Sequence, residues 1–252
     1  MKKIFVRILL VVVVLLVAAV VAVSLFLDRG IKKGIETVGP RLTQVSIKVD
    51  DVGLSLLSGS GEIKGLEVGN PEGYSAPTAI KIGEASMAIS PGSLLSDKVV
   101  IKHIRVHSPE LTIEGTPNKN NLTKIRENVE AATGGGAATE PAPEGGPAKK
   151  LQVNEFVLAD TKVNYVPPGF GGRSFPIVIP SIRLTDLGTG PEGITAGDLT
   201  RRVLSELTAE LAPILAEKLA NLGKEALGTT NGAAGDAIDK ATRGVTDLFK
   251  KK

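Results

Sequence analysis

The sequence has no cysteine and no tryptophan, and its only histidines are His103 and His107. Without cysteine there can be no disulfide, thiolate metal site or cysteine nucleophile, and two histidines leave few ways to build a metal or acid–base site. The two histidines are four residues apart, which would join them on a helix, yet they stand in strand-like sequence. We therefore expect no enzymatic activity, no metal site and no cofactor.

Neither basic nor acidic residues predominate in the sequence. The 252 residues include 30 basic and 27 acidic side chains, a formal net charge of +3, and both signs are scattered along the chain. A protein that neutralises nucleic-acid phosphates concentrates its basic residues on one stripe or face. Nucleic acid is therefore not an expected partner.

One long apolar run stands at the amino terminus. It extends from Ile8 to Leu27 with Ser24 as its only polar member, and three basic residues precede it. About 20 apolar residues cross a bilayer as a helix, whereas a cleavable signal peptide has an apolar region of about 7–15 residues. We predict an uncleaved, single-pass membrane anchor with its amino terminus on the cytoplasmic side.

The apolar period changes after this run. Residues Gly30 to Val38 place apolar side chains on one face of a short helix, which we expect to end at Pro40. From Val45 to Glu114, apolar and polar residues alternate over short runs that Gly, Asn-Pro and Ser-Pro separate, a pattern typical of a β-meander. Asn121 is placed to cap a brief helix, and the Gly/Pro/Ala-rich stretch from Gly134 to Pro147 is typical of a linker.

A six-residue pattern, apolar-x-x-apolar-x-apolar, recurs in the strand-like sequence. Its five copies begin at Ile63, Ile82, Ile101, Val153 and Ile179. Because the side chains of a regular strand alternate between faces, positions i and i+3 share a face only where a bulge or bend separates them. The repeat therefore predicts one curved, mainly antiparallel sheet that includes both β regions.

The third and fourth copies also match beyond the pattern. With a shift of 52 residues, five apolar positions coincide: Ile101 with Val153, Ile104 with Phe156, Val106 with Leu158, Leu111 with Val163, and Ile113 with Tyr165. The match favours an internal duplication; the alternative is the chance alternation of any β protein.

The carboxy-terminal residues return to a helical period. Asp198 is placed to cap a helix with a leucine-rich stripe, which we expect Pro213 to kink or restart and Gly223 to end, and Gly235-Asp236 starts another. The stripes are rich in Ala and Leu with acidic residues between them. This favours packing against the sheet over a contact with the membrane surface.

Three motifs between residues 45 and 129 resemble those of a known family. A strand from Gly61 ends in the turn Asn70-Pro71-Glu72-Gly73-Tyr74, the pair Leu94-Leu95 precedes an Ile-rich strand that leads to Ser108-Pro109, and Asn120-Asn121-Leu122 opens a helix. In combination they resemble AsmA-like proteins, with a weaker echo over residues 151–187.

The resemblance implies a bacterial inner-membrane protein that projects into the periplasm and has an α+β fold, in which a taco-like β-groove holds lipid acyl chains. The expected divisions are an anchor at 1–29, an AsmA-like β-region at 30–130, a linker at 131–150, a second β-segment at 151–190 and a helical tail at 191–252. Long family members are thought to move phospholipid between membranes. At about 4.8 Å per strand, this chain's groove would be roughly 40 Å long, too short to cross a periplasm alone.

The predicted groove would be lined by the apolar positions of the bent strands. These candidates are Ile63, Leu66, Val68, Ile82, Ile101, Ile104, Val106, Leu111, Ile113, Val153, Phe156, Leu158 and Val163. The expected partners are the membrane, a phospholipid ligand and an envelope protein. Two alternatives stay open: a structural or adaptor protein of an envelope complex whose tail helices cover the sheet, and a small anchored β-sandwich of the water-stress type.

Overall fold

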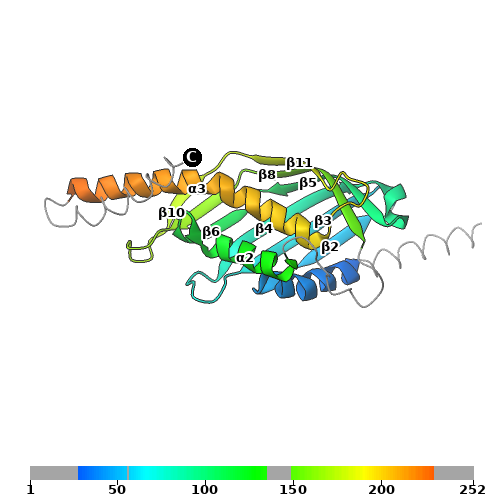
Figure 1. Ribbon diagram of the computed structural model, residues 1–252, viewed down its shortest axis with the longest axis horizontal. Coiled ribbons are helices and arrows are strands. Elements are labelled where there is room, and N and C mark those ends of the chain that lie inside the picture. Colours follow the sequence, from blue (N-terminus) through cyan, green and yellow to red (C-terminus); the bar gives the residue numbers. More distant parts are fainter. Residues whose placement is uncertain (1–27, 56, 135–148, 230–252) are drawn as a thin grey trace, which may run out of the picture.

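The computed structural model describes residues 28–55, 57–134 and 149–229 (Figure 1). The predicted membrane span at residues 8–27, most of the predicted linker and the second tail helix lie outside these residues. None of the helices in the described ranges is long and apolar enough to span a membrane. The described chain has the expected α+β architecture, with one large mixed sheet and helices on one of its faces.

The described residues form eleven strands and four helices. The strands are β1 (Ile47–Lys48), β2 (Asp51–Ser55), β3 (Ser60–Gly69), β4 (Thr78–Ile89), β5 (Lys98–His107), β6 (Glu110–Thr116), β7 (Lys119–Asn120), β8 (Lys150–Ala159), β9 (Lys162–Val166), β10 (Phe175–Val178) and β11 (Ile182–Leu187). The helices are a first helix over residues 28–43, the short 3-10 helix η1 (Pro91–Leu95), α2 (Asn121–Ala132) and α3 (Ala196–Thr229).

Strands that follow one another in the chain lie end to end in the sheet: β6 continues the line of β5, and β9 continues that of β8. β5 and β6 both pair with β4, β8 and β9 run parallel to β5 and β6, and β10 and β11 return antiparallel to β9 and β8. On the other side of β4, β3 pairs with β4, and both β1 and β2 pair with β3. Both β regions therefore belong to one sheet, as the repeat predicted.

The 52-residue shift found in the sequence is the register of the parallel pairs. All five matched positions lie opposite one another: Ile101 and Val153, Ile104 and Phe156, Val106 and Leu158, Leu111 and Val163, Ile113 and Tyr165. The two similar segments are thus direct neighbours. Like side chains form apolar rows across the sheet, as parallel strands in register require.

Bends of the expected kind are present in the first and third copies of the repeat. In the first copy Gly65 adopts φ +61° between Ile63 and Leu66. In the third copy Ala88 pairs with His103 but the next residue, Ile89, pairs with Ile101, so that Lys102 is a bulge. Each irregularity turns positions i and i+3 to the same face of the sheet.

The bend at Gly65 continues across the neighbouring strands. Gly65 and Gly83 are both skipped between the Lys64–Glu84 and Leu66–Ile82 pairs. Further along the sheet, Ser108 and Asp160 separate β5 from β6 and β8 from β9, and both have positive φ, +45° and +52°. These positions form a crease at which the sheet curves.

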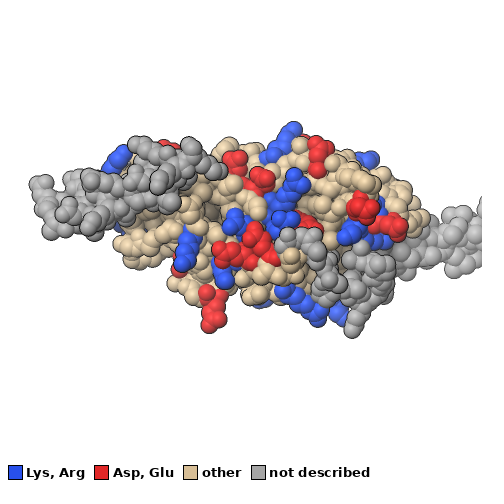
Figure 2. Space-filling view, viewed as in Figure 1, with Lys and Arg blue, Asp and Glu red and all other residues tan. Residues whose placement is uncertain are grey.

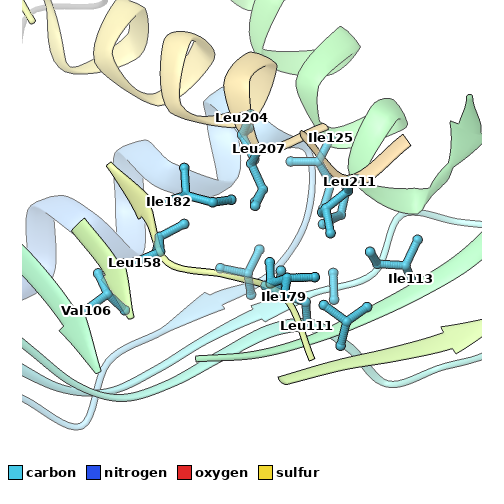
Figure 3. Packing of buried hydrophobic residues seen from close by; sticks show 14 of the residues in the cluster. Val106, Leu111, Ile113, Ile125, Leu158, Ile179, Ile182, Leu204, Leu207 and Leu211 are labelled. Carbon is cyan, nitrogen blue, oxygen red and sulfur yellow. The ribbon is translucent and has the colours of Figure 1, made fainter. Parts of the chain in front are cut away.

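Helices cover the apolar face of this curved sheet. Figure 1 shows α2 and α3 lying across it, and Figure 3 shows Leu207 and Leu211 pointing from α3 toward Leu111 and Ile179. Side chains from both helices and from the sheet form one buried cluster, the main cluster, in which Ile125 of α2 is 1% exposed. Burial of a side chain of this size contributes about 1.5–3 kcal/mol, so this contact is a large part of the fold's stability.

The opposite face of the sheet is charged. Arg183 and Arg105 lie 3.1 and 3.9 Å from the carboxylate of Glu155, and Lys81 lies 3.4 Å from that of Glu67. Such exposed pairs contribute about 0–1 kcal/mol each and mainly keep this face in solvent. On the helix side, Figure 2 also shows basic and acidic side chains intermixed.

The first helix covers the β1–β2 edge of the sheet with polar side chains. The backbone N–H of Leu54 donates to Asp28 Oδ1 at 2.8 Å, the N–H of Val49 donates to Glu36 Oε1 at 3.1 Å, and Lys32 Nζ donates to the carbonyl of Asp50 at 2.8 Å. These bonds satisfy edge groups that another strand would otherwise pair with.

The first helix does not end at Pro40, contrary to our expectation. It continues to residue 43, where the buried Leu42 and Thr43 and the bond from the Gln44 N–H to the Pro40 carbonyl at 2.9 Å hold its last turn. A proline removes one donor, and the packing of this turn outweighs that loss.

The capping residues also differ from those expected. Asn120, not Asn121, caps α2 by accepting from the N–H of Thr123 at 3.0 Å. Thr195 precedes α3 and accepts from the N–H of Asp198 at 3.0 Å, so Asp198 lies inside the helix. α3 then continues through Pro213 and past Gly223, because its leucines pack on the sheet and tertiary burial outweighs the low helix propensity of both residues.

We predict that substitution by alanine at Gly65 and at Gly83, the two glycines of the crease, changes the free energy of unfolding by different amounts. A Cβ at Gly65 would lie 1.9 Å from Asp50 Oδ2 and would hold alanine at positive φ, whereas a Cβ at Gly83 has nothing within 4 Å. We expect Gly65→Ala to lower the free energy of unfolding by about 1–3 kcal/mol or more. Gly83→Ala should change it by less than about 1 kcal/mol. Urea unfolding of the full chain in detergent micelles, followed by circular dichroism, measures both; equal effects would contradict a strained crease.

Candidate functional site

The candidate lining residues all lie in the curved sheet. Eight of them are buried: Val68, Ile101, Val106, Leu111, Ile113, Val153, Leu158 and Val163. Four are half-buried and pack against the buried clusters: Ile63, Ile82, Ile104 and Phe156. Leu66 is half-buried and belongs to neither cluster. The sequence pattern therefore located one continuous apolar surface, which the structure divides into two parts.

The larger part is filled by the protein's own helices. Val106, Leu111 and Leu158 share the main cluster with Leu211 and Leu215 of α3, which are 2% and 1% exposed. A ligand can reach this part only if α3 moves. Helix α3 of the tail thus packs on the sheet, which is the arrangement that the Ala- and Leu-rich stripes favoured.

The smaller part has less helical cover. Its buried residues, which we call the second cluster, are Ile89, Ile101, Val153 and Leu187. Half-buried apolar side chains surround it: Leu54, Met87, Leu94, Val99, Ile104, Phe156, Leu184, Ile194 and Leu199. In this set, α3 contributes Leu199 alone. Ile104 and Phe156 also contact the main cluster, so the apolar surface is unbroken.

The two polar motifs of the sequence are joined by one buried amide. Asn121, at the start of α2, is 0% exposed. Its Nδ2 donates to Asn70 Oδ1 at 2.6 Å and to the carbonyl of Thr112 at 2.7 Å, and its Oδ1 accepts from the N–H of Glu114 at 3.0 Å. Both motifs are therefore structural: they fix α2 to β6 and to the loop after β3.

A carboxylate holds the rest of that loop. Glu114 accepts from the backbone N–H groups of Ser75, at 2.9 Å, and Ala76, at 3.1 Å. Gly73 has φ +91°, which the turn after Pro71 requires. Burial, and then the nearby carboxylates of Glu127 and Glu114, raise the pKa of the Tyr74 hydroxyl above its ordinary value.

The two histidines lie on β5. His107 is exposed and His103 is half-buried. Within the described residues, no three His, Cys, Asp or Glu side chains are placed to hold a metal ion. Tyr165 is 0% exposed, and burial raises the pKa of its hydroxyl to about 12, which keeps it neutral in the core.

Comparison with known protein families gave a result that agrees with the motifs and the fold. The model of the AsmA family matches residues 1–166. The chain belongs to the AsmA family. Comparison with curated proteins and with solved structures gave no significant match. As a member of the family, it is an envelope-associated protein.

The matched residues stop at the end of β9. This AsmA region contains the crease, the amide network and both parallel segments, whereas β10, β11 and α3 lie beyond it. The leucines that α3 contributes to the main cluster therefore come from outside the matched region. Periodicity could identify the stripe of α3, but which part of the sheet it covers depends on the path of the chain after β11.

The buried amide predicts a loss of stability specific to its site. Asn121→Ala leaves the carbonyl of Thr112 and the N–H of Glu114 without their partner, at about 1–3 kcal/mol for each buried group. Asn154→Ala, at an exposed position of β8, should cost less than about 0.5 kcal/mol. Chemical unfolding of both variants measures the difference. An Asn121→Ala protein as stable as the control would show that the network does not hold α2.

Proposed function

We propose that this chain is a single-pass inner-membrane protein whose periplasmic domain binds phospholipid acyl chains at the second cluster. The proposal rests on which part of the apolar surface the helices cover least. Leu54 borders the second cluster, and its N–H donates to Asp28 at 2.8 Å. Asp28 directly follows the apolar run that ends at Leu27, so the less covered end of the sheet is the end next to the predicted anchor.

The chemistry of this surface suits flexible apolar ligands. Ile104, Phe156 and Leu184 are half-buried apolar side chains that no charged group of the opposite face reaches, because residues of one strand alternate between faces. Each methylene transferred from water to such a surface contributes about 0.8 kcal/mol. Binding of this kind needs no directional bond, in keeping with the absence of a polar site among these side chains.

The length of accessible apolar surface limits what the protein can do with such a ligand. Since α3 fills the main cluster, acyl chains have access to one end of the sheet and not to its whole length. We propose local holding of lipid at the membrane and delivery to a partner, as a contribution to envelope biogenesis. Movement of α3 away from the sheet would be needed to lengthen the path.

Crosslinking at adjacent residues tests lipid binding. We would place the photoreactive residue p-benzoylphenylalanine at Phe156, on the apolar face, and at Val157, on the charged face, in the full chain in bacterial membranes. We expect a phospholipid adduct at position 156 and none at 157. The same residue at Leu15, within the predicted span, serves as a positive control. If Leu15 gives an adduct and Phe156 does not, the lipid-binding proposal is wrong.

A second function is favoured by one observation, the burial of two leucines of α3. Leu207 and Leu215 are 4% and 1% exposed, so the domain has a closed core without any ligand. The alternative is thus a structural or adaptor protein of an envelope complex. It predicts that position 156 crosslinks only to α3 or that position 157 crosslinks to a partner protein.

A further inference from the structure

Large apolar side chains are exposed at one end of the domain. Among the described residues, the exposed large hydrophobic side chains are Ile31, Leu57, Leu95 and Val178, with exposed fractions of 37%, 81%, 95% and 84%. Single exposed apolar residues are ordinary on protein surfaces. Their position is the informative feature, because only Val178, on β10, lies away from the others.

Hydrogen bonds bring the first three into one region. Leu57 lies in the turn between β2 and β3, and the N–H of Ile89, just before η1, donates to the Gly59 carbonyl in that turn at 2.6 Å. Leu95 ends η1. Figure 1 shows η1 at the same end of the sheet as the start of the first helix, where Ile31 lies.

This region lies next to the residue that leaves the predicted span. Asp28 accepts from the N–H of Leu54, three residues before Leu57. A helix rises about 1.5 Å per residue, so Ile31 lies about 4.5 Å along the first helix from Asp28, the residue that follows the predicted span. A bilayer that holds residues 8–27 would therefore have its surface beside these side chains.

Basic side chains accompany the apolar ones. Arg29 and Lys33 are exposed on the first turns of the first helix, and Lys149 donates to the carbonyls of Leu94 and Ser96 beside Leu95. Lys98, at the start of β5, donates to the carbonyl of Gly190. Asp97 is the acidic residue nearest in sequence to Leu95. Exposed leucines flanked by lysine and arginine are typical of contacts with anionic lipid surfaces.

We propose that Ile31, Leu57 and Leu95 dock this end of the domain onto the bilayer that holds its own anchor. The proposal rests on the anchor of the proposed function and goes beyond it, because an anchor alone does not fix how the domain is oriented against the bilayer. Two leucine-bearing turns and the first helix make three contacts, which fix the domain's orientation. The second cluster, bordered by Leu54 and Leu94, then faces the lipid surface.

The sequence makes a direct test possible because it has no tryptophan. We would prepare four single-tryptophan variants of the full chain: Leu57→Trp and Leu95→Trp at the docking turns, Val178→Trp as an equally exposed control, and Leu15→Trp within the predicted span. Each is reconstituted into vesicles of phosphatidylethanolamine and phosphatidylglycerol, with and without lipids brominated on their acyl chains. Bromine quenches tryptophan only at close range.

Docking predicts loss of emission at positions 57 and 95, with a blue-shifted maximum, and no loss at position 178. Quenching at position 15 with none at 57 or 95 would overturn docking while leaving the anchor in place. Absence of quenching at position 15 would overturn the anchor, and docking with it. Equal quenching at 57, 95 and 178 would also overturn the proposal, since it would indicate non-specific adsorption.

Discussion

The rest of this structure depends on the burial of the apolar face of its bent sheet. Strands that follow a regular pleat could not turn all five copies of the repeat to one side. The positive φ of Gly65 and the bulge at Lys102 do so in the first and third copies, and the positive φ of Ser108 and Asp160 adds to the curvature between strands. The curved face is then wide enough to need a cover, which α2 and α3 supply.

The helices cover the apolar face unevenly, and the proposed function depends on this difference. α3 packs its leucines over the main cluster and reaches the second cluster with Leu199. The less covered end carries the start of the first helix, the β2–β3 turn and η1. Anchoring, membrane contact and access to an apolar surface would thus coincide at one end, while the opposite, charged face stays in solvent.

Much of this fold could be predicted from local sequence. Alternation gave the strands, and the i, i+3 pattern gave the bends, because side-chain direction in a strand is set by the backbone alone. The 52-residue shift identified residues that prove to be neighbours, although sequence similarity does not reveal whether two segments pair. For the candidate site, the pattern found the apolar face from Ile63 to Val163.

Other features depend on tertiary contacts that no local pattern records. Pro40 and Gly223 do not end their helices, because buried neighbours such as Leu42 and Leu222 hold the turns around them. The partners of Asn121 lie 7, 9 and 51 residues away, so the role of the amide is not visible in its own motif. Which candidate residues are covered by α3 likewise follows from the path of the chain after β11.

Amide hydrogen exchange of the full chain in lipid vesicles tests the central claim, that α3 covers the main cluster. The account predicts that the amides of α3 near Leu207 and Leu211 exchange as slowly as those of β6 and β9 beneath them, because helix and sheet open together. Rapid exchange along α3 with protected strands would show an apolar face that is open at rest, and would contradict the account.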